Sequence, residues 1–358
     1  MKGQSTSTSE SDTSGRTDAA AEELEYTCAA DVVEEDVEWL WLNTFPKAKL
    51  SVLAGMLGAG KSFFTMMMAA RVSSGTPFLN STRPVERGQV LILQYEDGLK
   101  DTVIKRLRWE GADMSMIGFI TGTKGRDGKS RGVDLSADVE KLRLKIRELG
   151  NVKLIIVDPL SSYVGLHKKM DSYKDTDVRE ALRPLTDLIE QEKVAVIGIM
   201  HLNKSQMSDP RHRVVGSAAW MQVPRVAWWI SEDKNDKDLH WFLAVKNNTI
   251  PLAERKQAEF GFRFEENHIV VAQNEEPPSI EDVTRPEPPE DAKDRRSKVE
   301  TAVDFFEACR ASGEKELPAK DVMEAHHGIS KDIWAKARKK LGGISTEQRP
   351  DGWWWIFN

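Results

Sequence analysis

Short apolar runs rich in β-branched residues alternate with longer helical stretches from Lys47 onward. The predicted strands cover residues 50–54, 90–94, 117–121, 154–157, 194–200, 226–230 and 239–245. The predicted helices cover residues 61–73, 102–110, 137–149, 177–191 and 218–223. Apolar strands that alternate with helices predict a mainly parallel, twisted sheet with helices on both faces. No helix is predicted between the last strands, so one edge of the sheet should be antiparallel.

The pattern changes outside this α/β region, which we expect to span residues 37–272. Residues 1–36 are acidic and poor in apolar side chains, which predicts a disordered tail. The alternation over 37–42 predicts a short strand or an adapter that packs on the domain. Paired prolines among acidic residues predict an extended linker over 273–294, before a small segment at 295–358.

The small segment has the pattern of three helices followed by a hairpin. The helices are predicted at 297–311, 318–325 and 331–341, with Ser330 as the N-cap of the third, and the hairpin at 344–357. The third helix carries the basic residues Lys331, Lys336, Arg338, Lys339 and Lys340. This order resembles a winged helix-turn-helix, in which the third helix enters a DNA major groove and Arg349 on the wing touches phosphate or the minor groove. The alternative is a module that recruits another protein.

Composition and charge limit the classes of function. A chain of 358 residues is long enough for two or more domains. The net charge of −6 gives no global reason for nucleic-acid binding, so any such surface must be local. Cys28 and Cys309 are too far apart in sequence to indicate a zinc site or a disulfide framework. No signal peptide or bilayer-spanning run is apparent, so we expect a cytoplasmic protein without membrane contact.

A phosphate-binding loop is predicted between the first strand of the sheet and the helix after it. The sequence Gly-Met-Leu-Gly-Ala-Gly-Lys-Ser fits the pattern G-x-x-x-x-G-K-[ST] in the required strand–loop–helix context. The residues expected around the phosphates of ATP are Gly55, Met56, Leu57, Gly58, Ala59, Gly60, Lys61, Ser62 and Phe63. Glycines let the backbone N–H groups converge on an anion, and the helix start adds its positive end. Lys61 should reach the β- and γ-phosphates and Ser62 the Mg²⁺ ion; the alternative is a glycine-rich turn before an ordinary helix.

Three further strand ends carry polar groups that hydrolysis would need. Asp158 follows an apolar strand and should hold Mg²⁺ together with Ser62, unless it only caps a turn. Glu96 and Asp97 follow another apolar strand, and either could polarise the attacking water, unless Asp97 only caps the next turn. His201 ends a later strand and would sense the γ-phosphate, unless its role is structural.

With these strand ends in place, residues 39–271 resemble the RecA-like ATPases of the AAA-family type, close to plasmid RepA replicative helicases. Besides the loop, the motifs that carry the resemblance are Tyr95-Glu96-Asp97-Gly98, Ile156-Val157-Asp158-Pro159-Leu160-Ser161-Ser162-Tyr163, Asp177-Val178-Arg179 with Leu182-Arg183-Pro184-Leu185, Ile199-Met200-His201-Leu202-Asn203-Lys204, Arg213-Val214-Val215-Gly216-Ser217-Ala218 and Val245-Lys246-Asn247-Asn248.

The resemblance implies a RecA-like fold and roles for several residues. Glu96 takes the place of the catalytic carboxylate, and His201 that of the polar sensor. Arg213 stands where such ATPases place an arginine finger into a neighbouring subunit's nucleotide. Lys246 matches a late-strand lysine that faces a neighbour's phosphates.

One departure from the family pattern concerns the neighbour's contribution. Hexameric relatives of the DnaB kind carry Arg two residues after that lysine, whereas this chain has Asn248. The finger role therefore shifts to Arg213 or Arg225, either of which is alternatively a surface ion pair. The resemblance implies a homohexameric ring in which the polar loops 161–176 and 203–215 face single-stranded DNA in the channel.

The leading hypothesis is an ATP-driven motor or loader that acts on DNA, most specifically a helicase in replication or mobile-element maintenance. One rival is a nucleotide-gated DNA-binding regulator in which slow hydrolysis times release. A small-molecule P-loop kinase is disfavoured, because the chain lacks an Arg-rich lid and carries the terminal module.

Overall fold

The computed structural model describes residues 26–125, 128–166, 170–201, 217–284, 290–326 and 328–357, with side chains only from residue 298 onward in the helix that begins at Glu290. The first 25 residues of the expected tail lie outside these ranges. Residues 1–38 form a unit of their own, and its described part carries the short 3-10 turn η1 (Ala29–Asp31), which is exposed. Among the helices of the described residues, none combines the length and the apolar character needed to cross a bilayer.

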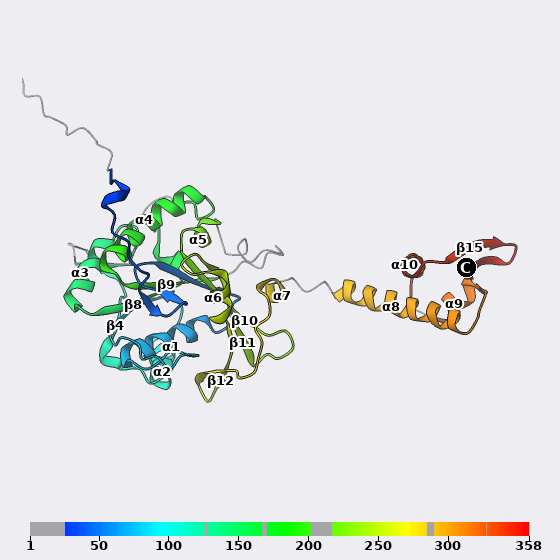
Figure 1. Cartoon of the computed structure of the whole chain (residues 1–358), viewed down its shortest axis with the longest axis horizontal. Helices are drawn as coiled ribbons and strands as arrows, with labels where there is room; N and C mark the ends of the chain where they lie inside the picture. The colour runs from blue at the N-terminus through cyan, green and yellow to red at the C-terminus, as the bar shows by residue number, and fades with distance from the viewer. Residues whose placement is uncertain are drawn as a thin grey trace, which may run out of the picture. The chain divides into compact units, whose positions relative to one another are not determined.

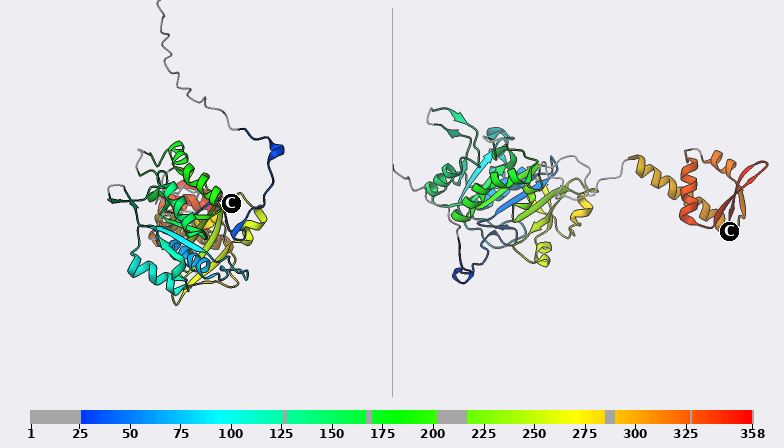
Figure 2. Two further views of the ribbon diagram at one scale, coloured as in Figure 1. Left: turned by 90° about the vertical axis from the view of Figure 1, so that its left-hand side faces the viewer. Right: turned by 90° about the horizontal axis from the view of Figure 1, so that it is seen from above.

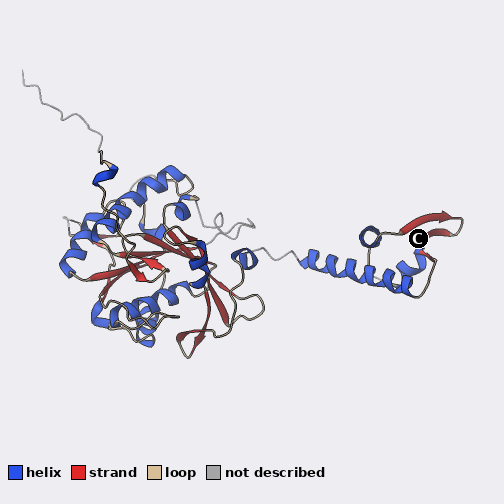
Figure 3. Cartoon of the chain, in the orientation of Figure 1, coloured by secondary structure: helices blue, strands red, loops and turns tan. Residues whose placement is uncertain are grey.

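A large sheet forms the centre of the α/β region (Figures 1 and 3). Its strand order is β13-β12-β11-β10-β3-β9-β8-β4-β5. The parallel strands are β3 (Leu50–Gly55), β4 (Gln89–Gln94), β5 (Ile117–Phe119), β8 (Val152–Asp158), β9 (Ala195–His201) and β10 (Val226–Glu232). The antiparallel edge consists of β11 (Leu239–Asn247), β12 (Phe260–Glu265) and β13 (His268–Val271). The prediction of a mainly parallel sheet with one antiparallel edge is confirmed.

Helices cover both faces of this sheet. On one face lie α1 (Lys61–Ser74) and α2 (Ile104–Trp109), which follows the π-helical turn η2 (Leu99–Val103); on the other lie α3 (Val139–Leu149) and α4 (Asp175–Glu192). Along β4, Val90 and Ile92 pack in the α1–α2 core, whereas Leu91 and Leu93 pack in the α3–α4 core. Because successive strand residues face opposite sides, a strand covered on both faces is apolar throughout. The shorter helices are η3 (Met114–Met116), η4 (Leu160–Tyr163), α5 (Ala219–Gln222) and α6 (Leu252–Gln257).

The adapter predicted near Trp39 is a small antiparallel pair. Strand β1 (Trp39–Trp41) pairs with β2 (Phe45–Pro46). The Trp41 ring stacks on Phe78 with centroids 4.6 Å apart, within a cluster that also contains Phe64 and Phe242. The aromatic side chains thus fix the adapter to the α1 face of the sheet.

Several elements differ from the expected pattern, among them α6, β12 and β13, which were not predicted. A hairpin of β6 (Thr123–Lys124) and β7 (Ser130–Arg131) follows β5. The stretch expected to be an extended linker contains α7 (Ile280–Thr284), whose Ile280 and Val283 pack against the core. The helix forms there because the Ser279 hydroxyl accepts a hydrogen bond from the Asp282 amide, which satisfies one of the free amides at the helix start.

The C-terminal segment, whose helices and strands Figure 2 shows, has its own hydrophobic core. Its elements are α8 (Glu290–Ala311), β14 (Glu316–Pro318), α9 (Ala319–Ala325), α10 (Lys331–Leu341), β15 (Ile344–Arg349) and β16 (Gly352–Phe357). The sheet order is β14-β16-β15, and β14 was not predicted. Phe306, Trp334 and Trp355 pack together with ring centroids 5.0–5.2 Å apart. Trp353 shares a strand face with Trp355 but is exposed, because it lies at the turn end of the hairpin.

Candidate nucleotide-binding site

The predicted phosphate loop connects β3 to α1 with glycines in conformations that other residues rarely adopt. Gly58 and Gly60 have φ of 83° and 87°. At Gly55, a Cβ atom would lie 2.2 Å from the carbonyl oxygen of Ile230 on the neighbouring strand β10. The close approach of two strands, and not the turn alone, therefore requires glycine at the start of the loop.

We expect Gly55→Ala to destabilise the fold by about 3 kcal/mol or more, because both the backbone strain and the contact with Ile230 must be relieved. The matched control is Gly111→Ala, because Gly111 also has a positive φ, of 74°. A Cβ atom at Gly111 would have no atom of the described residues within 4 Å, apart from its chain neighbours. That variant should lose only about 1 kcal/mol. Urea denaturation of both variants tests this, and equal losses would show that the contact with Ile230 is not what requires glycine.

Lys61 begins α1 and is 3% exposed. Its Nζ donates hydrogen bonds to the carbonyl oxygens of Gly55 at 3.0 Å and Met56 at 2.7 Å. Burial lowers the pKa of Lys61 to about 8, against the opposing attraction of Asp158 and Glu96. The ammonium is thus desolvated inside the loop, where a phosphate would be its natural counter-charge.

The affinity for ATP should fall as the pH rises through about 8. A bound triphosphate stabilises the charged form of Lys61 and raises its pKa above the value of about 8 in the free protein. Above that pH the lysine of the free protein is neutral, so ATP binding takes up a proton. Each further increase of one pH unit then weakens ATP binding by up to about tenfold. Titrations with a fluorescent ATP analogue between about pH 7 and 9.5 measure this. Lys61→Arg, which stays charged, should flatten the profile; an unchanged profile in that variant would show that another group titrates.

Asp158 ends β8 beside the loop, and its side chain is almost fully buried. The Ser62 hydroxyl donates a hydrogen bond to Asp158 Oδ2 at 2.7 Å. The other oxygen, Oδ1, is buried and has no hydrogen-bond partner among the described residues. Burial raises the pKa of Asp158, while Ser62 and His201 oppose that shift. A buried, half-satisfied carboxylate is costly unless a further donor or cation completes it.

Glu96 and His201 face Asp158 from the two strands beside β8. Glu96 follows β4, whose Gln94 is in register with Asp158, and His201 ends β9 in register with Gly55. His201 Nε2 and Glu96 Oε2 are 3.1 Å apart, and one polar atom from each of Glu96, Asp158 and His201 lies within 4.8 Å of the others. The structure therefore brings these three predicted residues together at the mouth of the loop.

Asp97 lies in a different environment from Glu96. Its carboxylate accepts a hydrogen bond from Arg106 Nη1 at 2.5 Å, and its backbone carbonyl accepts one from Gln94. This ion pair explains why Asp97 does not join the acidic cluster. Of the two carboxylates considered from the sequence, Glu96 is the one that lies beside Asp158.

The side-chain oxygen atoms at this site fit Mg²⁺ as ligands. The ion prefers oxygen ligands, and it is commonly held by one or two protein groups together with phosphate oxygens. Ser62 Oγ and the unpartnered Asp158 Oδ1 are the oxygens placed to hold it, directly or through its water shell. The orphaned buried oxygen is the observation that favours a cation here over a purely structural Asp.

Of the two remaining predicted site residues, the structure describes only Lys246. Arg213, with the rest of the predicted channel loop 203–215, lies outside the described residues. Lys246 of β11 lies toward the opposite end of the strands. It pairs with Ala227 of β10, and Ala227 is in register with Val52 of β3. The loop begins further along β3, at Gly55. Any contact of Lys246 with nucleotide would therefore involve a second subunit.

The Lys246 ammonium is held by backbone carbonyls at its own end of the sheet. Its Nζ donates to the carbonyl oxygens of Met221, Gln222 and Pro224 at 3.3, 2.7 and 2.7 Å. Burial lowers its pKa, and the nearby charges of Arg225 and Arg179 act in the same direction. An anion from another molecule would stabilise the charged form of Lys246 at this position.

An aromatic group beside the loop was missed from the sequence. The Phe264 ring of β12 lies 2.5 Å from where a Cβ of Gly60 would be, and its centroid is 5.2 Å from that of Phe63. Trp109 stacks with Phe63 at 6.5 Å. Phe264 and Trp109 are both partly exposed. Neither belongs to a local motif, because the ring contacts depend on the pairing of β12 at the distant edge of the sheet.

Comparison with known families agrees with this geometry. A family model described as an AAA domain matches residues 20–207, which is more than half of the chain. The match contains the loop, both carboxylate-bearing strand ends and His201. No curated protein matches the sequence. The chain belongs to the AAA-domain family of P-loop ATPases.

Proposed function

We propose that the protein is an ATP-hydrolysing motor or loader of the RecA-like class that acts on DNA, with a RepA-type helicase as its most specific form. The observation that carries the proposal is the convergence of Lys61, the Ser62–Asp158 pair and the Glu96–His201 pair on one edge of the sheet. A phosphate loop alone only binds nucleotide, whereas hydrolysis also needs a cation anchor and a group that orients water.

Each residue has a distinct part in the proposed reaction. Lys61 exchanges the carbonyls of Gly55 and Met56 for the β- and γ-phosphates. Ser62 and Asp158 would hold Mg²⁺, which would neutralise part of the phosphate charge. Glu96 accepts a hydrogen bond from the attacking water and orients it in line with the γ-phosphate. His201 holds the Glu96 carboxylate and is placed to respond when the γ-phosphate leaves.

The aromatic group of Phe63, Trp109 and Phe264 supplies a surface for the nucleobase. It borders the loop at Gly60, on the side where the helix α1 begins. The partly exposed rings offer π-faces for stacking, which is worth about 1–3 kcal/mol per base. This surface recognises an aromatic base without selecting one base by hydrogen bonding.

A second copy of the chain is proposed to cover the nucleotide. Large apolar side chains are exposed in loops on the phosphate-loop edge of the sheet: Leu57 is 82% exposed and Tyr95 is 81% exposed. On the opposite edge, Lys246 and Arg255 line a cavity of about 510 Å³. Joining these two different edges gives a head-to-tail contact, which closes into a ring such as the hexamer implied by the resemblance. Arg213 or Arg225 would then serve as the finger, worth about 10³–10⁵ in rate.

The C-terminal segment is proposed to be a winged helix that binds duplex DNA. Its order of helix, strand, two helices and two strands supports this, with α10 as the groove-binding helix. Ile333, Trp334 and Ala337 are buried, while Lys331, Lys336, Lys339 and Lys340 are exposed. Arg349 is bonded to both carboxylate oxygens of Glu316, at 3.0 and 2.8 Å, so the wing arginine already has an anionic partner. Contacts to phosphate are therefore assigned to α10.

Replacing Lys336 and Lys339 together by Ala should weaken duplex DNA binding and flatten its salt dependence. Each phosphate contact contributes about −0.9 to the slope of log K against log salt, so the slope should fall in magnitude by about 2. The matched control replaces Lys315 and Lys320, two exposed lysines elsewhere in the segment. Fluorescence anisotropy between about 50 and 200 mM salt measures both. Equal losses in the two double variants would favour a protein partner for this segment.

ATPase assays with and without single-stranded DNA test the whole proposal. A motor predicts strong stimulation of turnover by the single strand. The second candidate, a nucleotide-gated regulator, is favoured by the same terminal segment and predicts slow turnover that DNA does not change. Phosphate transfer to a metabolite without any effect of nucleic acid would refute both.

A further inference from the structure

A cavity of about 220 Å³ lies outside the nucleotide site, between the ends of β4 and β5 and the first turns of α3. Its apolar floor includes Leu93, Ile120 and Leu142. Three lysines, Lys124, Lys141 and Lys145, line it as well. The cavity therefore combines an apolar body with a concentration of positive charge.

The topology of the sheet opens a crevice at this place. After β4 the chain continues into α2 on one face, and after β5 it continues into α3 on the other face. The two strands are parallel neighbours, with Ile92 in register with Phe119. In open α/β sheets, ligands bind outside the carboxyl ends of strands whose connections diverge to opposite faces. The phosphate loop uses a different strand end, so this crevice is a separate position.

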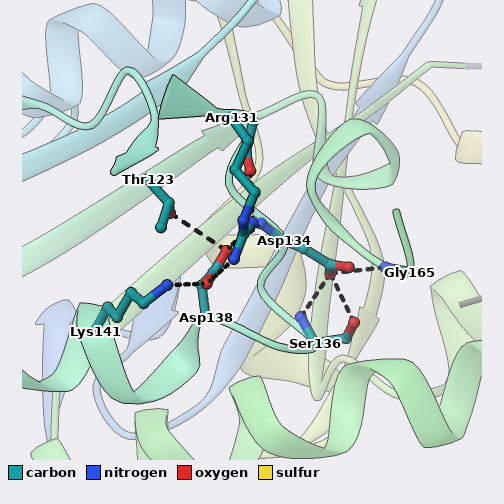
Figure 4. A network of polar contacts seen from close by, with 8 residues as sticks. Thr123, Arg131, Asp134, Ser136, Asp138, Lys141 and Gly165 are labelled. Atoms are coloured by element: carbon teal, nitrogen blue, oxygen red, sulfur yellow. Dashed lines mark hydrogen bonds and ion pairs between the residues drawn. The ribbon is translucent and has the colours of Figure 1, made fainter. Parts of the chain in front are cut away.

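Thr123, Asp138 and Lys141, which line the cavity, belong to a larger network of polar contacts (Figure 4). Asp138 is 3% exposed and accepts hydrogen bonds from Arg131 at 2.7 and 2.6 Å and from Lys141 at 2.8 Å. Asp134, fully buried, accepts bonds from Ser136 and from the Gly165 amide. The network ties the β6–β7 hairpin to the start of α3 and to the segment after η4, so the wall is preformed.

The charge balance at the cavity favours an anion. The Asp138 carboxylate is neutralised within the wall by Arg131 and Lys141. Lys145 is paired with Glu148. Glu148 is exposed in the last turn of α3 and does not line the cavity. Lys124 is exposed on β6 at the mouth. Lys124 and Lys145 are therefore placed to receive an anionic head group from a ligand whose body lies on the floor.

We infer that this cavity is a second ligand site, which binds a small amphipathic anion: a carboxylate or phosphate attached to a short apolar body. A water occupies about 30 Å³, so the cavity has room for a body of roughly six to eight non-hydrogen atoms. The two lysines supply charge-assisted hydrogen bonds to the head group. Burial of the body against leucine and isoleucine supplies the remaining affinity.

Calorimetric titration of the full chain with phenyl phosphate and with hexanoate tests this site and distinguishes the two head groups. At least one should bind, whereas acetate and benzyl alcohol, which lack the apolar body or the charge, should not. Replacing Lys124 and Lys145 together by Met should weaken binding by at least about tenfold. Lys105→Met, an exposed lysine of α2 that does not line the cavity, should leave it unchanged.

The phosphate loop gives the decisive control. Lys61→Ala should retain binding of the amphipathic anion, because the cavity does not include Lys61. Loss of binding in that variant, equal binding of benzyl alcohol, or wild-type affinity in the double lysine variant would each overturn the inference. None of these outcomes depends on whether the protein hydrolyses ATP.

Discussion

Replacing Glu96 by Gln should lower the ATPase kcat by about 10²–10⁴-fold, the range that a positioned proton acceptor contributes. ATP affinity should change little, because Glu96 lies beyond the residues of the loop that surround the phosphates. The side chain stays the same size and can still pair with His201, so the variant removes the charge and basicity alone. Steady-state turnover together with equilibrium binding of an ATP analogue separates the two quantities.

Asp97→Asn is the matched control for that experiment. Asp97 is the adjacent carboxylate, but it is paired with Arg106 at 2.5 Å. Its loss should affect kcat by less than about tenfold, because Asp97 is paired with Arg106 and does not face Asp158. If Asp97→Asn were the inactive variant and Glu96→Gln retained activity, the assignment of the water-orienting group would have to be reversed.

Lys61→Ala should abolish hydrolysis and also weaken nucleotide binding. Removing one preorganised donor to a developing charge costs about 10²–10³ in kcat, and here the ground-state attraction to the phosphates is lost as well. We therefore expect a loss of at least about 10³-fold in kcat/KM. Unlike Glu96→Gln, this variant should fail in the binding assay too.

Lys49→Ala controls for the loss of a positive charge near the same strand. Lys49 directly precedes β3 and pairs with Glu190 at the surface, at 3.0 Å. Its removal should leave kcat/KM within about threefold of wild type, because a surface pair contributes little. Comparable losses in the two lysine variants would indicate a general electrostatic effect, and the specific role of Lys61 in the loop would be refuted.

The parallel half of the fold was predictable because of its burial. Strands such as β8 and β9 are covered on both faces, and this produces uninterrupted apolar runs that end abruptly in Asp158 and His201. The loop sequence between β3 and α1 has a fixed spacing that backbone geometry imposes. From these local signals, the positions of Lys61, Ser62, Asp158 and His201 on one edge of the sheet follow, whereas the choice of Glu96 over Asp97 depends on the family resemblance.

The remaining features depend on contacts that no local pattern encodes. Strand β12 carries Phe262 and Phe264 at alternate positions, and it forms only because β11 and β13 pair with it. The position of the Phe264 ring over Gly60 therefore depends on tertiary contacts. The β6–β7 hairpin depends on Asp138, a buried carboxylate that bonds Arg131 and Thr123, which lie 7 and 15 positions earlier in the chain. No periodicity of the sequence reveals such a contact.

The burial of Lys61 and Asp158 is the physical centre of the site. Two groups of opposite charge, Lys61 at the end of the loop and Asp158 beside it, are desolvated, and burial displaces the pKa of each toward its neutral form. Such displacement is expensive for stability but common where a protein must bind a strongly charged ligand. Binding of a magnesium–triphosphate complex would favour the charged form of both groups.

A crystal structure with Mg²⁺ and a non-hydrolysable ATP analogue tests this claim most directly. Lys61 Nζ should leave the carbonyl oxygens of Gly55 and Met56 for the phosphates, and Ser62 Oγ and Asp158 should both lie beside the ion. A triphosphate bound elsewhere, or a loop in which Lys61 keeps both carbonyl bonds while the analogue is absent at saturating concentration, would contradict it.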